Sequence, residues 1–193
     1  VREDGEIYCV PEASESGRVA LYRAVEFPAE WERVGVLLED EAALDCTVFR
    51  HGGRWWLFAA DDCTGPRHVL RAWHAGSLRG AWRAHAKNPV KVDVDSARPA
   101  GTPFRHGGEL YRPAQGGARR YGEALVLNRV DVLTPERFAE TVVRRIDPDP
   151  DGPCPHGVHT LSRLGGDRCL IDGNRARLSH HELLRRLRDT VGL

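Results

Sequence analysis

The chain has 193 residues, which is enough to bury one sizeable core but not clearly two. Its 28 basic residues balance its 28 acidic residues, so charge gives no reason to expect nucleic acid or an anionic membrane as a partner. No apolar run approaches the roughly 20 residues of a membrane-spanning helix, and we expect no membrane span.

The methionine and cysteine content bears on the origin and environment of the chain. The sequence contains no methionine and opens inside a repeat, so we expect a fragment or a processed piece of a longer protein. Its five cysteines form no Cys-x-x-Cys pair, which disfavours a zinc ribbon, and their odd number disfavours a disulfide framework. A cysteine in or beside a strand behaves as a small hydrophobe. We therefore expect a reduced, cytoplasmic protein.

One short motif recurs along the chain. Residues 46–58 contain an apolar run, a turn with two glycines and an aromatic-rich run, a pattern that predicts a β-hairpin. Residues 103–112 repeat its Phe-Arg-His-Gly-Gly core, residues 1–8 are a shorter copy and residues 160–171 a weaker one. The last glycines of the four turns are 48, 55 and 58 residues apart: Gly5, Gly53, Gly108 and Gly166. A period near 50 with one hairpin in each period is typical of a β-propeller.

Two further strands are expected after each of the first three hairpins. They fall at residues 19–25 and 31–38, at 68–74 and 81–85, and at 124–130 and 138–146. Between the last two strands, residues 134–137 are expected to form one helical turn. Four strands in each period, three times over, correspond to the blades of a propeller.

Three full blades and half of a fourth do not close a ring, and an open ring leaves unpaired strand edges. If one further blade lies upstream of residue 1, its strands complete a ring of five. We therefore predict an all-β, five-bladed β-propeller, with about three and a half blades in residues 1–178. A capping box at Ser179–Glu182 and leucines at helical spacing predict a short amphipathic helix over residues 179–193.

Antiparallel strand order predicts which polar residues meet. The starts of first strands, the ends of second strands and the starts of third strands share one face, and the Gly-Gly turns lie on the opposite face. First strands also line the central channel. The residues expected around this funnel are Glu12, Asp45, Asp62 of the Asp61–Asp62 pair, Arg98, Arg112, Gln115, Tyr121, Glu123 and His159.

Three of these carboxylates, Asp45, Glu12 and Glu123, are the candidate catalytic groups. Glycoside hydrolysis needs one carboxyl group that donates a proton and a second that acts as base or nucleophile. Each carboxylate also has a structural alternative. Asp45 could anchor backbone amides at a strand start, Glu12 could cap the loop 13–17, and Glu123 could pair with one of the arginines just before it.

The other candidates are assigned to ligand binding or to a metal. Arg98 precedes a proline at the channel mouth, where a guanidinium suits a carboxylate or phosphate group or could brace Asp45. Ligand binding is also expected of Arg112, Gln115, Tyr121 and Asp62. His159 could ligate an ion in the channel, or it could be a hydrogen-bonded core histidine.

Several segments of the sequence are similar, in order, to a known family. They are residues 10–24, 49–58, 96–101, 110–115 and 121–130. Together they resemble the propeller domain named after the N-terminal part of glucosamine inositolphosphorylceramide transferase, over roughly residues 1–175. In bacteria that domain is also found attached to formyltransferase-like domains. With the cysteine content, the resemblance implies a bacterial, cytoplasmic protein.

That domain in turn resembles the five-bladed propellers of glycoside hydrolase family 43 and of the invertase–levansucrase group. There, catalytic carboxylates come from the first strands of successive blades, and a channel histidine can hold a calcium ion. The resemblance implies that Asp45 matches the second of these carboxylates and that calcium, at His159, is the candidate cofactor. Cys46 replaces the usual proline, however, and Arg98 lies where the resemblance would place an acidic glutamate.

Two functions are therefore expected. The first is a carbohydrate-active or carbohydrate-binding propeller that takes a sugar or sugar-nucleotide ligand in its funnel, as a glycosidase or glycosyl-transfer relative if it is an enzyme. The second is a non-catalytic scaffold or substrate-recognition domain that serves a fused formyltransferase-like or glycosyltransferase domain. The sequence leaves open whether the domain is an enzyme.

Overall fold

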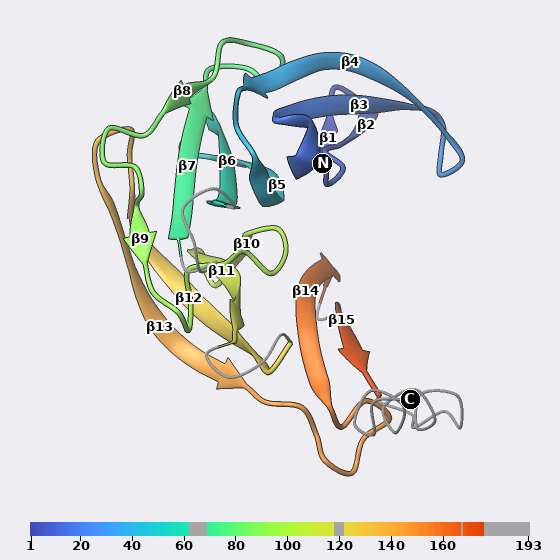
Figure 1. The fold of residues 1–193 in the computed structure, drawn as a ribbon, viewed down its shortest axis with the longest axis vertical. Helices are drawn as coiled ribbons and strands as arrows, with labels where there is room; N and C mark the ends of the chain where they lie inside the picture. Colours follow the sequence, from blue (N-terminus) through green and yellow to red (C-terminus); the bar gives the residue numbers. More distant parts are fainter. Residues whose placement is uncertain (62–68, 118–121, 167, 176–193) are drawn as a thin grey trace, which may run out of the picture.

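The computed structural model describes residues 1–61, 69–117, 122–166 and 168–175. Its strands form four antiparallel sheets that follow one another in chain order around an open arc (Figure 1). The first three sheets contain four or five strands and the last contains two. We refer to them as blade 1, blade 2, blade 3 and half-blade 4.

The strands within each blade have the following bounds. Blade 1 contains β1 (Arg2–Glu3), β2 (Glu6–Cys9), β3 (Arg18–Glu26) and β4 (Glu30–Glu39). Blade 2 contains β5 (Ala43–His51), β6 (Arg54–Asp61), β7 (Val69–Ala75), β8 (Arg83–Ala84) and β9 (Lys91–Val92), of which β8 and β9 both pair with β7. Blade 3 contains β10 (Phe104–His106), β11 (Glu109–Gly116), β12 (Ala124–Leu133) and β13 (Phe138–Ile146), and half-blade 4 contains β14 (Gly157–Gly165) and β15 (Arg168–Asn174).

The predicted all-β propeller with three and a half blades is confirmed. Within the described ranges the helical structure consists of one 3-10 helix, η1 (Ser14–Ser16). The helical turn predicted at residues 134–137 is wrong, because the Thr134 amide donates to the Arg137 carbonyl (2.9 Å) in a turn whose hydrogen bond runs opposite to that of a helix. The helix predicted over residues 179–193 lies outside the described residues.

The Gly-Gly turns have a direct conformational cause. Gly52 and Gly53 have φ angles of 57° and 76°, and Gly107 and Gly108 have φ angles of 58° and 87°. Two consecutive residues in the left-handed region form the tight turn that matches the twist of a hairpin, and glycine adopts this region without steric cost. The repeated motif therefore specifies a hairpin of defined register wherever it occurs.

The core lies between neighbouring blades, and β6 contributes to it from both faces. Trp55 and Leu57 pack against blade 1, whereas Trp56 and Phe58 pack toward blade 3. Leu57 and Phe58 are each 0% exposed, so each stabilises the fold by roughly 1.5–3 kcal/mol. A strand that is covered on both sides has an unbroken apolar sequence rather than an alternating one.

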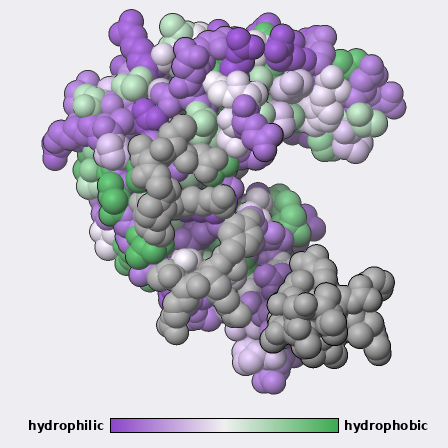
Figure 2. All heavy atoms as spheres, viewed as in Figure 1, coloured by the Kyte–Doolittle hydropathy of each residue, from purple (hydrophilic) through white to green (hydrophobic). Residues whose placement is uncertain are grey.

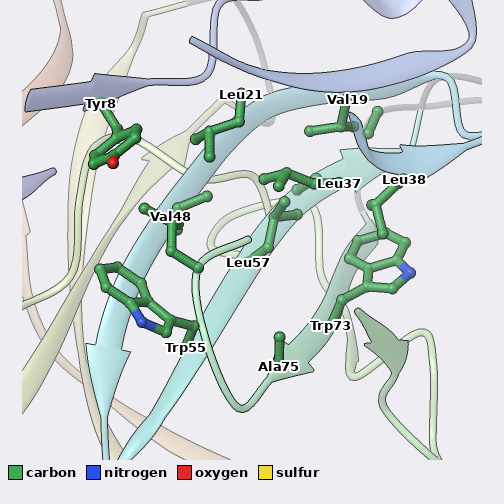
Figure 3. Packing of buried hydrophobic residues seen from close by; sticks show 13 residues of the cluster. Tyr8, Val19, Leu21, Leu37, Leu38, Val48, Trp55, Leu57, Trp73 and Ala75 are labelled. Carbon is green, nitrogen blue, oxygen red and sulfur yellow. The ribbon is translucent and has the colours of Figure 1, made fainter. Parts of the chain in front are cut away.

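Figure 3 shows the cluster between blades 1 and 2, where Leu21 and Leu37 from blade 1 lie next to Leu57 and Val48 from blade 2. The outer surface of these two blades is mostly hydrophilic, and the arc is open on one side (Figure 2). The apolar side chains buried between neighbouring blades hold each blade in its orientation, with its first strand on the inside of the arc.

Blade 3 and half-blade 4 meet through their backbones. The Leu161 amide donates to the Ala100 carbonyl at 2.8 Å. Gly101, with φ of 127°, lies so close that a Cβ atom would stand 2.1 Å from the Leu161 carbonyl oxygen. Only glycine fits this close approach, which holds the inner edges of the two sheets together beside the predicted funnel.

Candidate functional site

Asp45 lies at the start of β5, where the strand departs from regular pairing. The register between β5 and β6 shifts between Leu44 and Thr47, so a bulge includes Asp45. Asp45 has a φ angle of 51°, a left-handed conformation that aspartate tolerates better than most residues. Its amide is thereby turned out of the sheet, and it donates to Glu12 Oε2 at 2.8 Å.

The side chain of Asp45 contacts two residues from blade 3. Arg98 Nε donates a hydrogen bond to Asp45 Oδ2. Gln115 Nε2 lies 3.4 Å from the same oxygen and donates to the Pro99 carbonyl at 3.0 Å. Blades 1, 2 and 3 thus each contribute to one polar cluster around Asp45. Arg98 holds the Asp45 carboxylate, which was one of its two predicted roles.

A cavity of about 240 Å³ opens beside this cluster. Its wall comes from the first strands of blade 2 and half-blade 4 and from the segment that leads into blade 3. The lining residues are Asp45, Cys46, Thr47, Pro99, Ala100, Gly101, Thr102, Thr160 and Ser162. A second cavity, of about 180 Å³, shares Cys46, Thr47 and Thr102 with it and extends toward β2. The inner strands therefore enclose a polar hollow rich in hydroxyl groups.

Cys46 is not a nucleophile in this cavity. Burial, together with the nearby charges of Glu12 and Asp45, raises the pKa of the Cys46 thiol to about 12. The thiolate form, which nucleophilic attack and metal binding require, is therefore absent near neutral pH. Cys46 instead fills space in the cavity wall.

The remaining predicted carboxylate, Glu123, lies just before β12 and forms an ion pair with Arg145 at 3.2 Å. This arginine also contacts Asp147 at 2.8 Å. The arginines predicted as partners of Glu123 lie outside the described residues, as do Tyr121 and Asp62. Glu123 is thus engaged by an arginine of β13.

Arg112 is not brought to the cavity. Its side chain is 0% exposed and forms a bidentate pair with Glu140, with contacts of 2.8 and 2.5 Å. Its other donors reach the carbonyls of Ser96 and Ala97. The structure therefore places Arg112 inside blade 3, away from the ligand-binding position that the sequence predicted.

His159 forms a pair with Asp172 across half-blade 4, with 3.4 Å between Nδ1 and Oδ2. Burial alone would raise the pKa of Asp172, but hydrogen bonds from Thr160 and the His159 contact hold it below its usual value. Among the described residues, no group of three or more His, Cys, Asp or Glu side chains could hold a metal ion. Calcium at His159 therefore stays a prediction.

The hydroxyl groups of the cavity were not predicted as site residues. Thr160 and Ser162 are two positions apart on β14, so they point to the same face of that strand. Polar residues at alternate positions of a strand that faces a channel were the signal that could have identified them. Thr47 on β5 and Thr102 complete the set, joined by a hydrogen bond of 3.3 Å.

The fold is that of the glycoside hydrolase family 43 propellers. The Bacteroides ovatus protein "Xyloglucan PUL GH43B" matches with a TM-score of 0.58 and 16% identity, over 85% of this chain and 32% of that one. A mutant of the GH43 protein BlXynB from Bacillus licheniformis matches with a TM-score of 0.56 and 20% identity, over 77% of this chain and 33% of that one. The chain therefore forms part of a five-bladed β-propeller, and these likenesses concern the fold alone.

Residues 1–149 match the family model described as "Glucosamine inositolphosphorylceramide transferase 1, N-terminal", and the chain belongs to this family. The transferase of that name from Arabidopsis thaliana is 36% identical over 146 residues, which cover 72% of this chain and 19% of the relative. The one from Oryza sativa subsp. japonica is 36% identical over 148 residues, with the same coverage. The chain thus spans about a fifth of the length of these relatives. The family match ends before half-blade 4, earlier than the resemblance to residue 175 predicted.

These relatives also correct one expectation. They come from Arabidopsis and rice, so the prediction of a bacterial, cytoplasmic protein is wrong in its source, and the relatives' names state no compartment. Among the described residues, no helix has the length and apolar character that crossing a membrane requires.

Proposed function

We propose that this domain binds a carbohydrate or sugar-nucleotide ligand in the cavity beside Asp45 and serves as the substrate-recognition domain of a transferase. One observation carries the proposal: the first-strand carboxylate, Asp45, is held by Arg98 and Gln115 at the edge of a hydroxyl-lined cavity. The hydroxyl groups of the cavity suit a polar ligand, whereas Asp45 Oδ2 already accepts a hydrogen bond from Arg98.

The engagement of the carboxylates argues against hydrolysis. A glycosidase uses two carboxyl groups that flank the scissile bond, one as acid and one as base or nucleophile. Here Glu12 Oε2 binds the Asp45 amide, and Asp45 Oδ2 binds Arg98. Arg98 lies on the segment where the resemblance to glycoside hydrolases would place the acid. An arginine guanidinium keeps its protons near neutral pH, so it cannot replace that acid.

The chemistry of the cavity favours a sugar. Carbohydrate hydroxyl groups both donate and accept hydrogen bonds, and the carboxylate and hydroxyl groups that line the cavity match both needs. The guanidinium of Arg98 and the amide of Gln115 lie beside this lining, where they contact Asp45. The volume of about 240 Å³ lies below the roughly 300–1,000 Å³ of sites for drug-sized ligands, so it suits a single sugar ring. Arg98 suits the phosphate of an activated sugar, because guanidinium groups bind phosphate through two parallel hydrogen bonds.

The family supports the role in a larger enzyme. The curated relatives are named glucosamine inositolphosphorylceramide transferases, and this chain corresponds to 19% of their length. We therefore assign the transfer chemistry to a glycosyltransferase or formyltransferase-like domain joined to the propeller, and ligand recognition to the propeller itself. Glucosamine, its N-acetylated form and the UDP-activated N-acetylated form are the first ligands to test.

Isothermal titration of the purified chain with glucosamine, N-acetylglucosamine and UDP-N-acetylglucosamine tests the proposal. We expect at least one of these ligands to bind and its affinity to fall at least tenfold in Arg98→Ala. Arg129→Ala, which removes an exposed arginine of β12, is the matched control and should bind like the parent. Absence of binding by all three ligands would contradict the proposal.

A glycosidase is the second candidate, because Glu12 and Asp45 are adjacent through the hydrogen bond of 2.8 Å. The same purified chain should be assayed with nitrophenyl glycosides. Turnover by the parent that disappears in Asp45→Asn, with ligand binding retained, would establish this candidate in place of the recognition domain.

A further inference from the structure

We propose that Arg112 is a positioning residue for the binding site: together with Glu140 it holds the Arg98 segment, residues 96–100, so that Arg98 meets Asp45. The proposal goes one step beyond the function proposed above and rests on it for the role of Arg98 toward a ligand. The contact between Arg98 and Asp45 itself depends on no ligand, so the two proposals can fail separately.

The Arg98 segment is not part of a regular strand and relies on β11 for its shape. The Ala100 amide donates to the Pro113 carbonyl at 3.1 Å, and the Gln115 amide donates to the Arg98 carbonyl at 2.9 Å. The Gln115 side chain adds a bond of 3.0 Å to the Pro99 carbonyl. These contacts hold the second half of the segment against β11.

Arg112 holds the first half of the same segment. Its Nη1 donates to the Ala97 carbonyl at 3.1 Å, and its Nη2 donates to the Ser96 carbonyl. These two carbonyls come directly before Arg98, so they set the direction in which the backbone reaches it. A planar guanidinium with five donors can bind two carbonyls and one carboxylate in a fixed geometry, which a lysine ammonium cannot.

Glu140 keeps Arg112 in place. Its carboxylate, 3% exposed on β13, binds Arg112 through both oxygens. It also accepts a hydrogen bond of 2.7 Å from Lys91 Nζ on β9 of blade 2. Because a buried charge is costly unless it is paired, this arrangement has few alternatives, and the arginine cannot rotate away from the segment. The network therefore transmits the packing of blades 2 and 3 to the position of Arg98.

A purely structural role for Arg112 would produce a different result. In that case its replacement would lower stability but leave the Arg98–Asp45 contact intact in the molecules that stay folded. The Nε–H proton of Arg98 distinguishes the two roles, because its hydrogen bond to Asp45 slows its exchange with solvent. Its NMR signal is identified by its loss in Arg98→Lys.

The test compares Arg112→Lys with the control Arg129→Lys, which changes an arginine of β12 in the same blade. We expect the Arg98 Nε–H to exchange at least tenfold faster in folded Arg112→Lys and at the parent rate in Arg129→Lys. An unchanged exchange rate in folded Arg112→Lys would overturn the positioning role. If Arg112→Lys does not fold, Glu140→Asp, which keeps the charge but shortens the support of Arg112, is judged by the same criterion.

A binding measurement separates this result from the proposed function. With UDP-N-acetylglucosamine as the probe, we expect Arg112→Lys to lose affinity by a factor close to that of Arg98→Ala. If the parent binds none of the sugar probes, the proposed function fails, while the exchange of the Arg98 proton still decides whether Arg112 positions it.

Discussion

Blade 3 contributes to two arginine–carboxylate pairs that differ chiefly in burial. The side chains of Arg112 and Glu140 are 0% and 3% exposed, and their contacts lie inside the protein. Those of Arg98 and Asp45 are 14% and 24% exposed, and Asp45 lines a cavity. The same chemical pair is therefore buried inside the blade in one place and lies at the edge of a cavity in the other.

The difference follows from the cost of removing charge from water. Separation of a buried pair leaves each charge without compensation, so such a pair is held closed. At a partly exposed pair, water or a ligand can replace either partner, and the net contribution to stability is small. Burial, rather than residue type, thus distinguishes the two arginines.

The largest expected effect on stability comes from the buried pair. We predict that Arg112→Met lowers the free energy of unfolding by about 3 kcal/mol, because Glu140 and two carbonyls lose their donor inside the blade. Urea unfolding measures this loss. The double variant Arg112→Met/Glu140→Leu should recover part of the lost free energy of unfolding, because it leaves no unpaired buried charge. A loss below about 1 kcal/mol in the single variant would contradict the distinction between the buried and the partly exposed pair.

The second effect concerns the backbone just after Arg98, at Gly101. Gly101→Ala should lower the free energy of unfolding by about 2–3 kcal/mol, since the new Cβ would meet the Leu161 carbonyl and the backbone has a positive φ. Gly76→Ala is the control, because nothing lies within 4 Å of its Cβ. Equal unfolding midpoints for the two variants would show that blade 3 and half-blade 4 do not approach as described.

The partly exposed pair of Arg98 and Asp45 should respond in the opposite way. Arg98→Ala is expected to lower the free energy of unfolding by only about 1 kcal/mol, because water can solvate the remaining Asp45 carboxylate. Ligand affinity should nevertheless fall at least tenfold. A large stability loss without a change in affinity would make Arg98 a structural residue and remove the distinction between the two pairs.

The smallest effect is a pH dependence at the edge of the buried network. Burial alone would raise the pKa of Asp93, but hydrogen bonds from Ser96 and Asp95 and the charge of Lys91 hold it below its usual value. The stability from this group is therefore present above pH 3.8 and is lost as the pH falls through the lower folded-state pKa. Urea unfolding of the parent and of Asp93→Asn from pH 5 to about pH 2.5 should show a shallower acid decline in the variant.

Much of the fold could be predicted from local sequence. The strands expected at residues 19–25 and 138–146 correspond to β3 and β13, and the hairpin copies all form. Local chemistry explains this success, because a two-glycine turn between apolar runs specifies a hairpin without help from the rest of the chain. The strand expected at residues 81–85 shrinks to the two residues of β8, where pairing with β7 rather than strand propensity decides the length.

The repeated hairpin and the strand order also determined that Glu12, Asp45, Arg98 and Gln115 gather on one face, because antiparallel strands bring alternate ends together. The contacts of each of these side chains, in contrast, depend on the packing of neighbouring blades. The tertiary structure turned the Asp45 amide toward Glu12 and buried Arg112 against Glu140. Strand direction is a local property of the chain, whereas the partner of a side chain depends on how neighbouring blades pack against each other.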